Sequence, residues 1–131
     1  MPARPENVDR VTDFVNAQLA EWGCPDPVRI QVDVAVDEIF SNIARYAYRP
    51  ATGPATVRVD VRGGPLRVVI AFIDHGVPFD PLAADVPDTA GLPAKDRPLG
   101  GLGLFMVKRT MDGVEYSYRG GQNILPIRKH I

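Results

Sequence analysis

The stretch between residues 28 and 48 constrains the fold most, because it predicts one long amphipathic helix. Its apolar residues recur at three- and four-residue steps, the spacing that places side chains on one face of an α-helix. These residues are Val32, Val36, Ile39, Phe40, Ile43 and Ala47. The pattern stops before Pro50, as expected from the restriction that a proline places on the preceding residue. We therefore expect a core helix over this stretch.

Two further helices and four strands complete the predicted pattern. Apolar periodicity predicts a helix from Val8 to Trp22 and a shorter helix within 101–113. The segments with strand patterns are 55–62, 65–74, 114–119 and 123–129. This order predicts an α+β fold, a two-layer α/β sandwich in which helices cover one face of a mixed, mainly antiparallel sheet. A chain of 131 residues is expected to form a single domain, residues 1–131.

A long loop interrupts this pattern at about residues 81–99. The segment contains several prolines and charged residues and shows no helical or strand period. Loops of such length are uncommon inside a compact domain, and many of them are lids or binding loops. We expect a lid at this position.

Composition excludes several classes of function. The formal net charge is -1 and no block of like charges occurs, so a surface for direct nucleic-acid binding is not expected. Cys24 is the only cysteine, which rules out an internal disulfide and a zinc site built from cysteine pairs. The first ten residues lack the apolar core of a signal peptide, and no apolar run approaches the ~20 residues that span a bilayer. We expect a cytoplasmic protein that is not bound to a membrane.

Glu38 and Asn42 form a polar pair on the predicted core helix. Residues four apart stand one above the other, so the carboxylate and the amide face a common space at the edge of the buried side. A solvated polar edge with a hydrogen bond inside the helix explains an isolated pair of this kind better than a site does. The pair alone therefore does not define a site.

Asp74 and Gly76 stand where an apolar strand ends. A carboxylate held at a strand end can accept a hydrogen bond from an exocyclic amino group such as that of adenine, and glycine lets the backbone turn away. The alternative is an ordinary turn, in which Asp and Gly are common.

Gly100, Gly101 and Gly103 precede or begin the third predicted helix. Glycines at a helix N-terminus allow backbone N–H groups to approach phosphate oxygens. A hinge without a ligand is the alternative. The segment is neither a dinucleotide fingerprint, since Met106 replaces the third glycine, nor a P-loop, since no Gly-Lys-Ser/Thr follows.

In this order the motifs "EIFSN", "DHG" and "GLG" resemble the nucleotide-binding domain of DNA gyrase, sensor histidine kinases, mismatch-repair ATPases and a heat-shock chaperone, called the GHKL or Bergerat fold. The resemblance covers nearly the whole chain. Within that superfamily, "VDEIFSNIARYAY", "DHGVPFDP", "GGLGLFMVKRTMD" and "GGQNILPIRK" resemble the small anti-sigma factor serine kinases of the RsbW and SpoIIAB type. In such proteins a strand usually precedes the first helix, and here it is shortened to residues 1–6.

The resemblance implies a catalytic and a metal-binding residue on the core helix. Asn42 is expected to bind Mg²⁺ through its side-chain oxygen, a ligand type that suits this ion. Glu38 is expected to orient or deprotonate the attacking hydroxyl group.

The same resemblance implies the residues that bind ATP. Asp74 is expected to accept a hydrogen bond from the adenine amino group, with Gly76 permitting close approach and Asn123 standing near the base. The phosphates are expected against the segment Gly101, Leu102 and Gly103.

The implied function is that of an ATP- and Mg²⁺-dependent protein serine/threonine kinase. Its implied partners are an anti-anti-sigma (STAS) protein, which it phosphorylates, and a sigma factor or related regulator, which it sequesters. A homodimer is an alternative that the sequence leaves open. Two other functions also remain open, namely an ATP-controlled binding module without phosphotransfer and a detached histidine-kinase catalytic domain.

Overall fold

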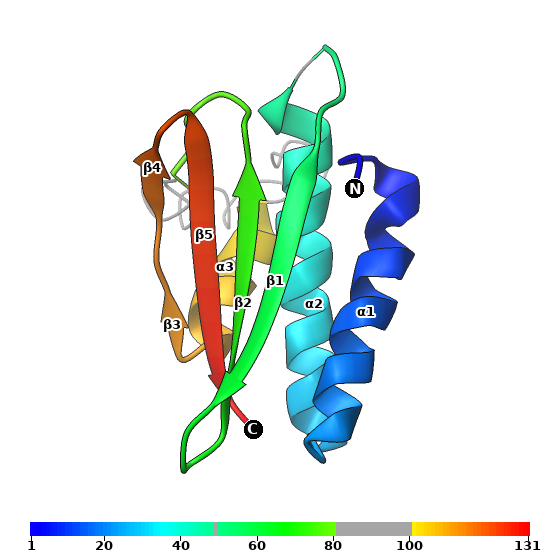
Figure 1. Ribbon diagram of the computed structural model, residues 1–131, viewed down its shortest axis with the longest axis vertical. Helices are drawn as coiled ribbons and strands as arrows, with labels where there is room; N and C mark the ends of the chain where they lie inside the picture. The colour runs from blue at the N-terminus through cyan, green and yellow to red at the C-terminus, as the bar shows by residue number, and fades with distance from the viewer. Residues whose placement is uncertain (49, 81–100) are drawn as a thin grey trace.

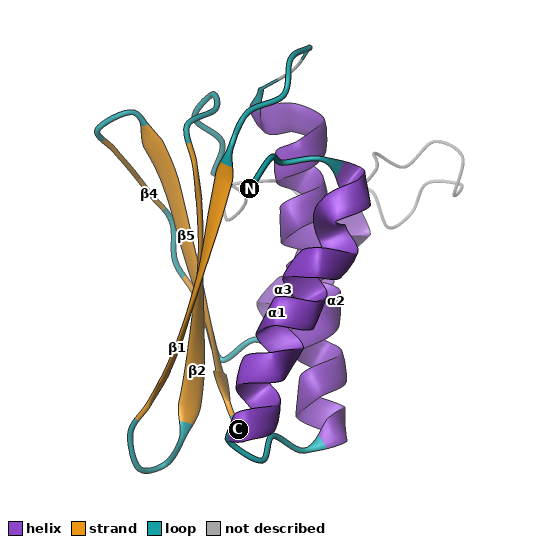
Figure 2. Ribbon diagram, turned by 45° about the vertical axis from the view of Figure 1, so that its right-hand side comes forward, coloured by secondary structure: helices purple, strands orange, loops and turns teal. Residues whose placement is uncertain are grey.

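The computed structural model describes residues 1–48, 50–80 and 101–131, so the predicted lid at 81–99 lies outside the described residues. Three helices pack on one face of a five-stranded sheet, and the other face of the sheet carries no helix of the described chain (Figures 1 and 2). The helices are α1 (Val8–Glu21), α2 (Asp26–Asn42) and α3 (Gly101–Thr110). The strands are β1 (Ala55–Arg62), β2 (Arg67–Asp74), β3 (Gly113–Val114), β4 (Ser117–Arg119) and β5 (Gln122–His130). The predicted α+β sandwich is confirmed.

The helical layer follows the predicted apolar periodicity. Helix α1 buries Val11, Val15 and Leu19, which are spaced by four residues. Helix α2 begins at Asp26, two residues before the predicted start, because Pro27 lies in its first turn, where a missing N–H costs no hydrogen bond.

Regular α-helical winding ends at Asn42. The next five residues, Ile43–Ala47, form a π-helix (η2), in which each turn contains more residues than in an α-helix. The helix predicted to residue 48 is therefore helical almost to its predicted end, but side-chain directions after Asn42 no longer follow a rotation of about 100° per residue.

The sheet has the strand order β1-β2-β5-β3, with β4 also paired to β5, and every pairing between described strands is antiparallel. Alternate residues of β2 and β5 point toward the helices and are buried. The buried positions are Val68, Ile70, Phe72, Asp74, Asn123, Leu125 and Ile127. The core thus lies between this face of the sheet and the buried sides of the helices.

Pro126 interrupts the strand that the sequence predicts at 114–119. Strands β3 and β4 pair with β5 in one continuous register, in which Glu115 falls opposite Pro126. The Glu115 N–H donates to the Pro126 carbonyl over 3.0 Å, but proline has no N–H to return. Glu115 and Tyr116 therefore lie outside both short strands.

The N-terminal residues lie beside the start of β1. Pro2 forms an antiparallel bridge with Pro54, and the Ala3 N–H donates to the Gly53 carbonyl over 2.8 Å. The short segment 1–6 thus contributes a single bridge to this edge. In the described part of the chain, no helix combines the length and the apolar character needed to cross a membrane.

Candidate functional site

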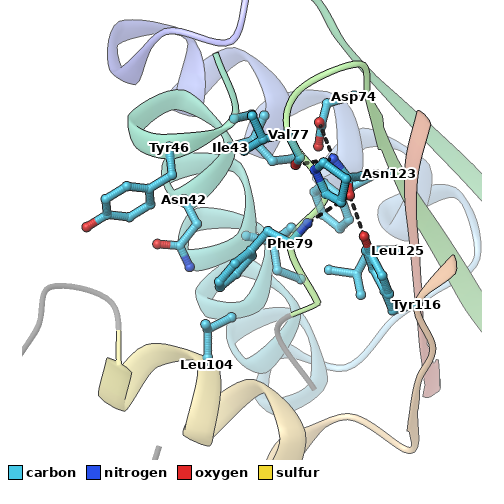
Figure 3. A pocket seen from close by; sticks show the side chains of 14 residues that line it. Asn42, Ile43, Tyr46, Asp74, Val77, Phe79, Leu104, Tyr116, Asn123 and Leu125 are labelled. Atoms are coloured by element: carbon cyan, nitrogen blue, oxygen red, sulfur yellow. Dashed lines mark hydrogen bonds between the residues drawn. The ribbon is translucent and has the colours of Figure 1, made fainter. Parts of the chain in front are cut away.

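A cavity opens between the end of α2, the π-helix, the ends of β2 and β5, and the first turns of α3 (Figure 3). It contains about 680 Å³ of empty space, counting the part open to solvent. Its lining consists of Ile39, Asn42, Ile43, Tyr46, Ala47, Phe72, Asp74, Val77, Pro78, Phe79, Leu104, Tyr116, Asn123 and Leu125. A mostly apolar cavity with a few converging polar groups is the usual form of a small-molecule site.

Asp74 and Asn123 are the two buried polar residues of the described chain, with exposed fractions of 5% and 6%. They are paired across β2 and β5, so that their side chains share one face of the sheet. Asn123 Nδ2 donates to Asp74 Oδ1 over 2.9 Å, and the Gly76 N–H donates to the same oxygen over 2.8 Å. The described residues give Asp74 Oδ2 no hydrogen bond, which leaves this oxygen to accept from a ligand.

Gly76 lies directly against the end of the π-helix. A Cβ at this position would overlap the backbone and side chain of Ala47, and the Val77 N–H donates to the Ala47 carbonyl over 3.0 Å. Glycine here is required by the packing of the strand-end loop on the helix. The close approach that the structure shows is to protein backbone, while the predicted approach to a ligand stays a prediction.

Tyr48, the residue after Ala47, holds the same loop through its hydroxyl. Its hydroxyl accepts a hydrogen bond from the His75 N–H over 2.7 Å and donates to the Pro54 carbonyl over 2.5 Å. Burial raises the pKa of Tyr48, while the hydrogen bond from His75 acts in the opposite direction. The loop after β2 is thus held at the end of the π-helix by Ala47 and Tyr48, and Tyr48 is itself bonded to Pro54, just before β1.

Asn42 lies at the junction between α2 and the π-helix and lines the cavity. Its Nδ2 atom is buried and has no hydrogen-bond partner among the described residues. A buried amide without a partner costs free energy unless a ligand satisfies it. Because the amide carries an oxygen and a nitrogen on one planar group, a half turn would present its oxygen in the same place.

Glu38 lies one helical turn before Asn42 and is half-buried, but it is not among the residues that line the cavity. Burial raises the pKa of the Glu38 carboxyl group, the negative charge of Asp37 raises it further, and Arg45 lowers it. The structure therefore brings Asp74, Gly76, Asn42 and Asn123 to one place, with Glu38 on the neighbouring turn.

The segment Gly101, Leu102 and Gly103 forms the first turn of α3, as predicted, and the next residue, Leu104, lines the cavity. The side chains of this turn lie outside the description. Its role toward phosphates stays a prediction.

Sequence reasoning missed three exposed apolar residues of the cavity. Tyr46, Val77 and Phe79 are 37%, 61% and 50% exposed, although large apolar side chains are normally buried. Tyr46 lies in the π-helix, where side-chain directions do not follow an α-helical wheel. The available signal for a ligand contact was the position of Phe79 after the end of an apolar strand, outside any predicted helix or strand.

Tyr116 is a fourth residue that the sequence did not single out. Its hydroxyl donates to Asn123 Oδ1 over 2.5 Å (Figure 3). Burial raises the pKa of Tyr116, and the Phe79 backbone N–H acts against this. A phenol pKa above its ordinary value of about 10 keeps the hydroxyl protonated at neutral pH, so that it can donate.

Comparison with known proteins finds a family match over almost the whole chain. Over residues 1–129 the chain matches the family described as histidine kinase-like ATPase domain. It is 29% identical over 103 residues to the serine/threonine-protein kinase BtrW of Bordetella bronchiseptica, an alignment that covers 79% of this chain and 71% of that protein. It is 30% identical over 95 residues to the serine-protein kinase RsbW of Bacillus cereus, which covers 70% of this chain and 58% of the relative. The RsbW of Bacillus mycoides is 28% identical over the same shares.

The chain thus spans somewhat more than half the length of these RsbW relatives and a larger part of BtrW. The family match, in contrast, extends over all but the last two of the 131 residues. The chain belongs to the histidine kinase-like ATPase domain family.

Proposed function

We propose that this protein is an ATP-dependent protein serine/threonine kinase that phosphorylates an anti-anti-sigma (STAS) partner and sequesters a sigma factor or related regulator. The observation that carries the proposal is the placement of Asp74 and Asn42 on one apolar cavity, a carboxylate beside β5 and an amide at the end of α2. The names of the relatives, serine/threonine-protein kinase BtrW and serine-protein kinase RsbW, support the reaction type.

Asp74 recognises the adenine base in this proposal. Its Oδ2 atom accepts a hydrogen bond from the exocyclic amino group of adenine, while Oδ1 is already engaged by Asn123 and Gly76. Guanine carries an oxygen where adenine carries this amino group, and two acceptors facing each other in a buried site are unfavourable. The exposed Phe79 and Val77 supply apolar surface that the base would cover.

Asn42 binds Mg²⁺ in this proposal, and its unpartnered buried amide fits such a ligand. The ion would neutralise negative charge on the phosphates and so favour phosphoryl transfer. The first turn of α3, with backbone N–H groups at a helix N-terminus, holds the phosphates.

Glu38 is the catalytic base of the proposed reaction. The serine or threonine oxygen of the partner bonds to the γ-phosphorus, the bond from that phosphorus to the β–γ bridging oxygen breaks, and ADP leaves. The proton of the hydroxyl group passes to the Glu38 carboxylate. A carboxyl pKa raised by burial brings this group nearer to the basicity that proton transfer at neutral pH requires.

One observation favours the alternative of an ATP-controlled binding module without phosphotransfer. Glu38 is absent from the lining of the cavity, one turn away from Asn42, so nothing in the described chain aims it at the nucleotide. In that alternative ATP binds in the same cavity and sets the affinity for a partner.

Phosphate transfer from labelled ATP distinguishes the two functions. The purified protein is incubated with γ-labelled Mg-ATP and soluble extract of its own cells, and phosphoamino acids are analysed. We expect one small protein to acquire phosphoserine or phosphothreonine, and Glu38→Ala to bind ATP without transferring phosphate. Normal ATP binding with no labelled partner would instead establish the binding module. An unchanged transfer rate in Glu38→Ala would remove Glu38 from the mechanism.

A further inference from the structure

Asn123 uses both ends of its amide on protein groups. Its Nδ2 donates to Asp74 Oδ1 and to the Val77 carbonyl, each over 2.9 Å, with the Gly76 carbonyl at 3.4 Å. Its Oδ1 accepts from the Tyr116 hydroxyl over 2.5 Å and from the Phe79 N–H over 3.2 Å. Two donors and two accepted bonds satisfy the amide, so Asn123 does not need the base as a partner.

The surroundings of Asn123 also fix which way its amide points. The Val77 carbonyl and the Asp74 carboxylate can only accept at the nitrogen end, while the Phe79 N–H can only donate at the oxygen end. A half turn would place acceptors against an acceptor at one end and donors together at the other. The Asn123 amide therefore has one orientation, with its oxygen toward Tyr116 and its nitrogen toward Asp74.

The register of β3 and β4 on β5 places Tyr116 in this network. In the continuous register of β3 and β4, Tyr116 falls opposite Leu125, on the same face of the sheet as Asn123. It is half-buried and lines the cavity. Its hydroxyl lies 2.5 Å from Asn123 Oδ1.

We infer that Tyr116 is a positioning residue for base selection, which acts through Asn123 to hold the Asp74 carboxylate with Oδ2 directed to the nucleotide. The inference rests on the proposed function, since it takes the cavity as the ATP site. Tyr116 and the Phe79 N–H together saturate Asn123 Oδ1, and hydrogen bonds in such a chain strengthen one another. Without the phenol, Asn123 Oδ1 keeps only the longer bond from the Phe79 N–H, so the amide, and with it the Asp74 carboxylate, is held less firmly.

Purine riboside triphosphate, which lacks the amino group of adenine, isolates this effect. The ratio of its dissociation constant to that of ATP measures the contact between Asp74 and the amino group. For Tyr116→Phe we expect this ratio to fall by about fivefold, as for the loss of one hydrogen bond, with affinity for the analogue almost unchanged. A residue that only stabilises the fold would weaken both nucleotides equally and leave the ratio as it was.

Tyr118→Phe is the matched control. Tyr118 pairs with Asn123 across β4 and β5, but it is exposed, and no hydrogen bond of its hydroxyl is seen in the described chain. Tyr118→Phe removes the same hydroxyl group as Tyr116→Phe. Its ratio of dissociation constants and its affinity for ATP should both equal those of the wild type. In an Asn123→Ser background, Tyr116→Phe should not lower the ratio further, because the route through the amide is already removed.

A ratio in Tyr116→Phe equal to that of the wild type would overturn the inference, as would full additivity of the two substitutions. A wild-type protein that binds ATP but does not prefer it to the analogue would also overturn it, while the kinase proposal would still be decided by phosphate transfer. Absence of ATP binding to the wild type would reject both.

Discussion

Asn123 and Asp74 are paired on neighbouring strands with 2.9 Å between the amide Nδ2 and the carboxylate Oδ1, in the most buried polar contact of the described chain. A carboxylate that loses such a partner keeps the cost of burial without the compensating hydrogen bond. Asn123→Leu is therefore expected to lower the free energy of unfolding by about 1–3 kcal/mol, measured by urea denaturation.

Gln122→Leu is the control for this change, because Gln122 precedes Asn123 on the same strand and is only half-buried. We expect it to alter stability by less than about 0.5 kcal/mol. Equal losses in the two variants would mean that the Asp74 contact adds nothing specific.

Gly76→Ala is expected to disrupt the contact between the strand-end loop and the π-helix. The new methyl group would overlap the backbone of Ala47, which cannot move without shifting the helix end. Overpacking of this kind costs about 1–3 kcal/mol, and nucleotide binding should weaken because Asp74 Oδ1 loses its bond from the Gly76 N–H.

Thermal unfolding and nucleotide titration measure both effects. Gly64→Ala, where the added methyl meets no atom within 4 Å, serves as comparison and should leave ATP affinity unchanged. Wild-type stability and ATP affinity in Gly76→Ala would show that the loop is not held as described.

Glu38→Gln is expected to stabilise the protein at neutral pH. The folded-state pKa of Glu38 is raised, so its ionised form costs more in the folded than in the unfolded chain, and stability falls as pH rises from the ordinary pKa through the raised one. Removing the charge should therefore increase the free energy of unfolding at pH 7 by roughly 0.5 kcal/mol. The gain should vanish below about pH 4, where both states bind the proton.

Urea denaturation across this pH range tests the sign, with the exposed Glu21→Gln on α1 as control. A loss of stability at neutral pH in Glu38→Gln would mean that a favourable partner outweighs burial. Phosphate transfer should be lost in the same variant, because glutamine cannot accept the proton.

Tyr48→Phe removes a hydroxyl that makes two backbone hydrogen bonds, one from His75 and one to Pro54. We expect a loss of about 1–2 kcal/mol in the free energy of unfolding, because the described residues offer the His75 N–H and the Pro54 carbonyl no other hydrogen bond. Tyr46→Phe removes the same atom from an exposed tyrosine two residues earlier and should change stability little. If both variants unfold at the same urea concentration, Tyr48 does not fix the loop.

Periodicity in the sequence predicted the layers of this fold because the helices and strands bury alternate or four-spaced residues in a regular way. The apolar positions of α1 and α2 and the alternation in β2 are signals within a single segment. Asp74 and Asn42 stood out for the same reason, as polar residues at the edge of an apolar pattern.

The missed features depend on contacts between segments. Tyr46 faces the cavity because the winding changes after Asn42, and no local pattern in the sequence announces a π-helix. A proline within a strand normally marks an edge strand. Strand β5 nevertheless lies inside the sheet, because Pro126 loses only the hydrogen bond that its N–H would have donated toward Glu115. The link from Tyr116 to Asn123 follows from the register of β4 on β5, which neither strand determines alone.

The most direct test of the account is calorimetric titration of the wild type and Asp74→Asn with Mg-ATP and Mg-GTP. The account predicts that the wild type prefers ATP, and that Asp74→Asn loses about tenfold or more in ATP affinity, because its amide cannot satisfy both the Asn123 donor and the adenine amino group. Equal affinity of the wild type for ATP and GTP, or undiminished ATP affinity in Asp74→Asn, would contradict it.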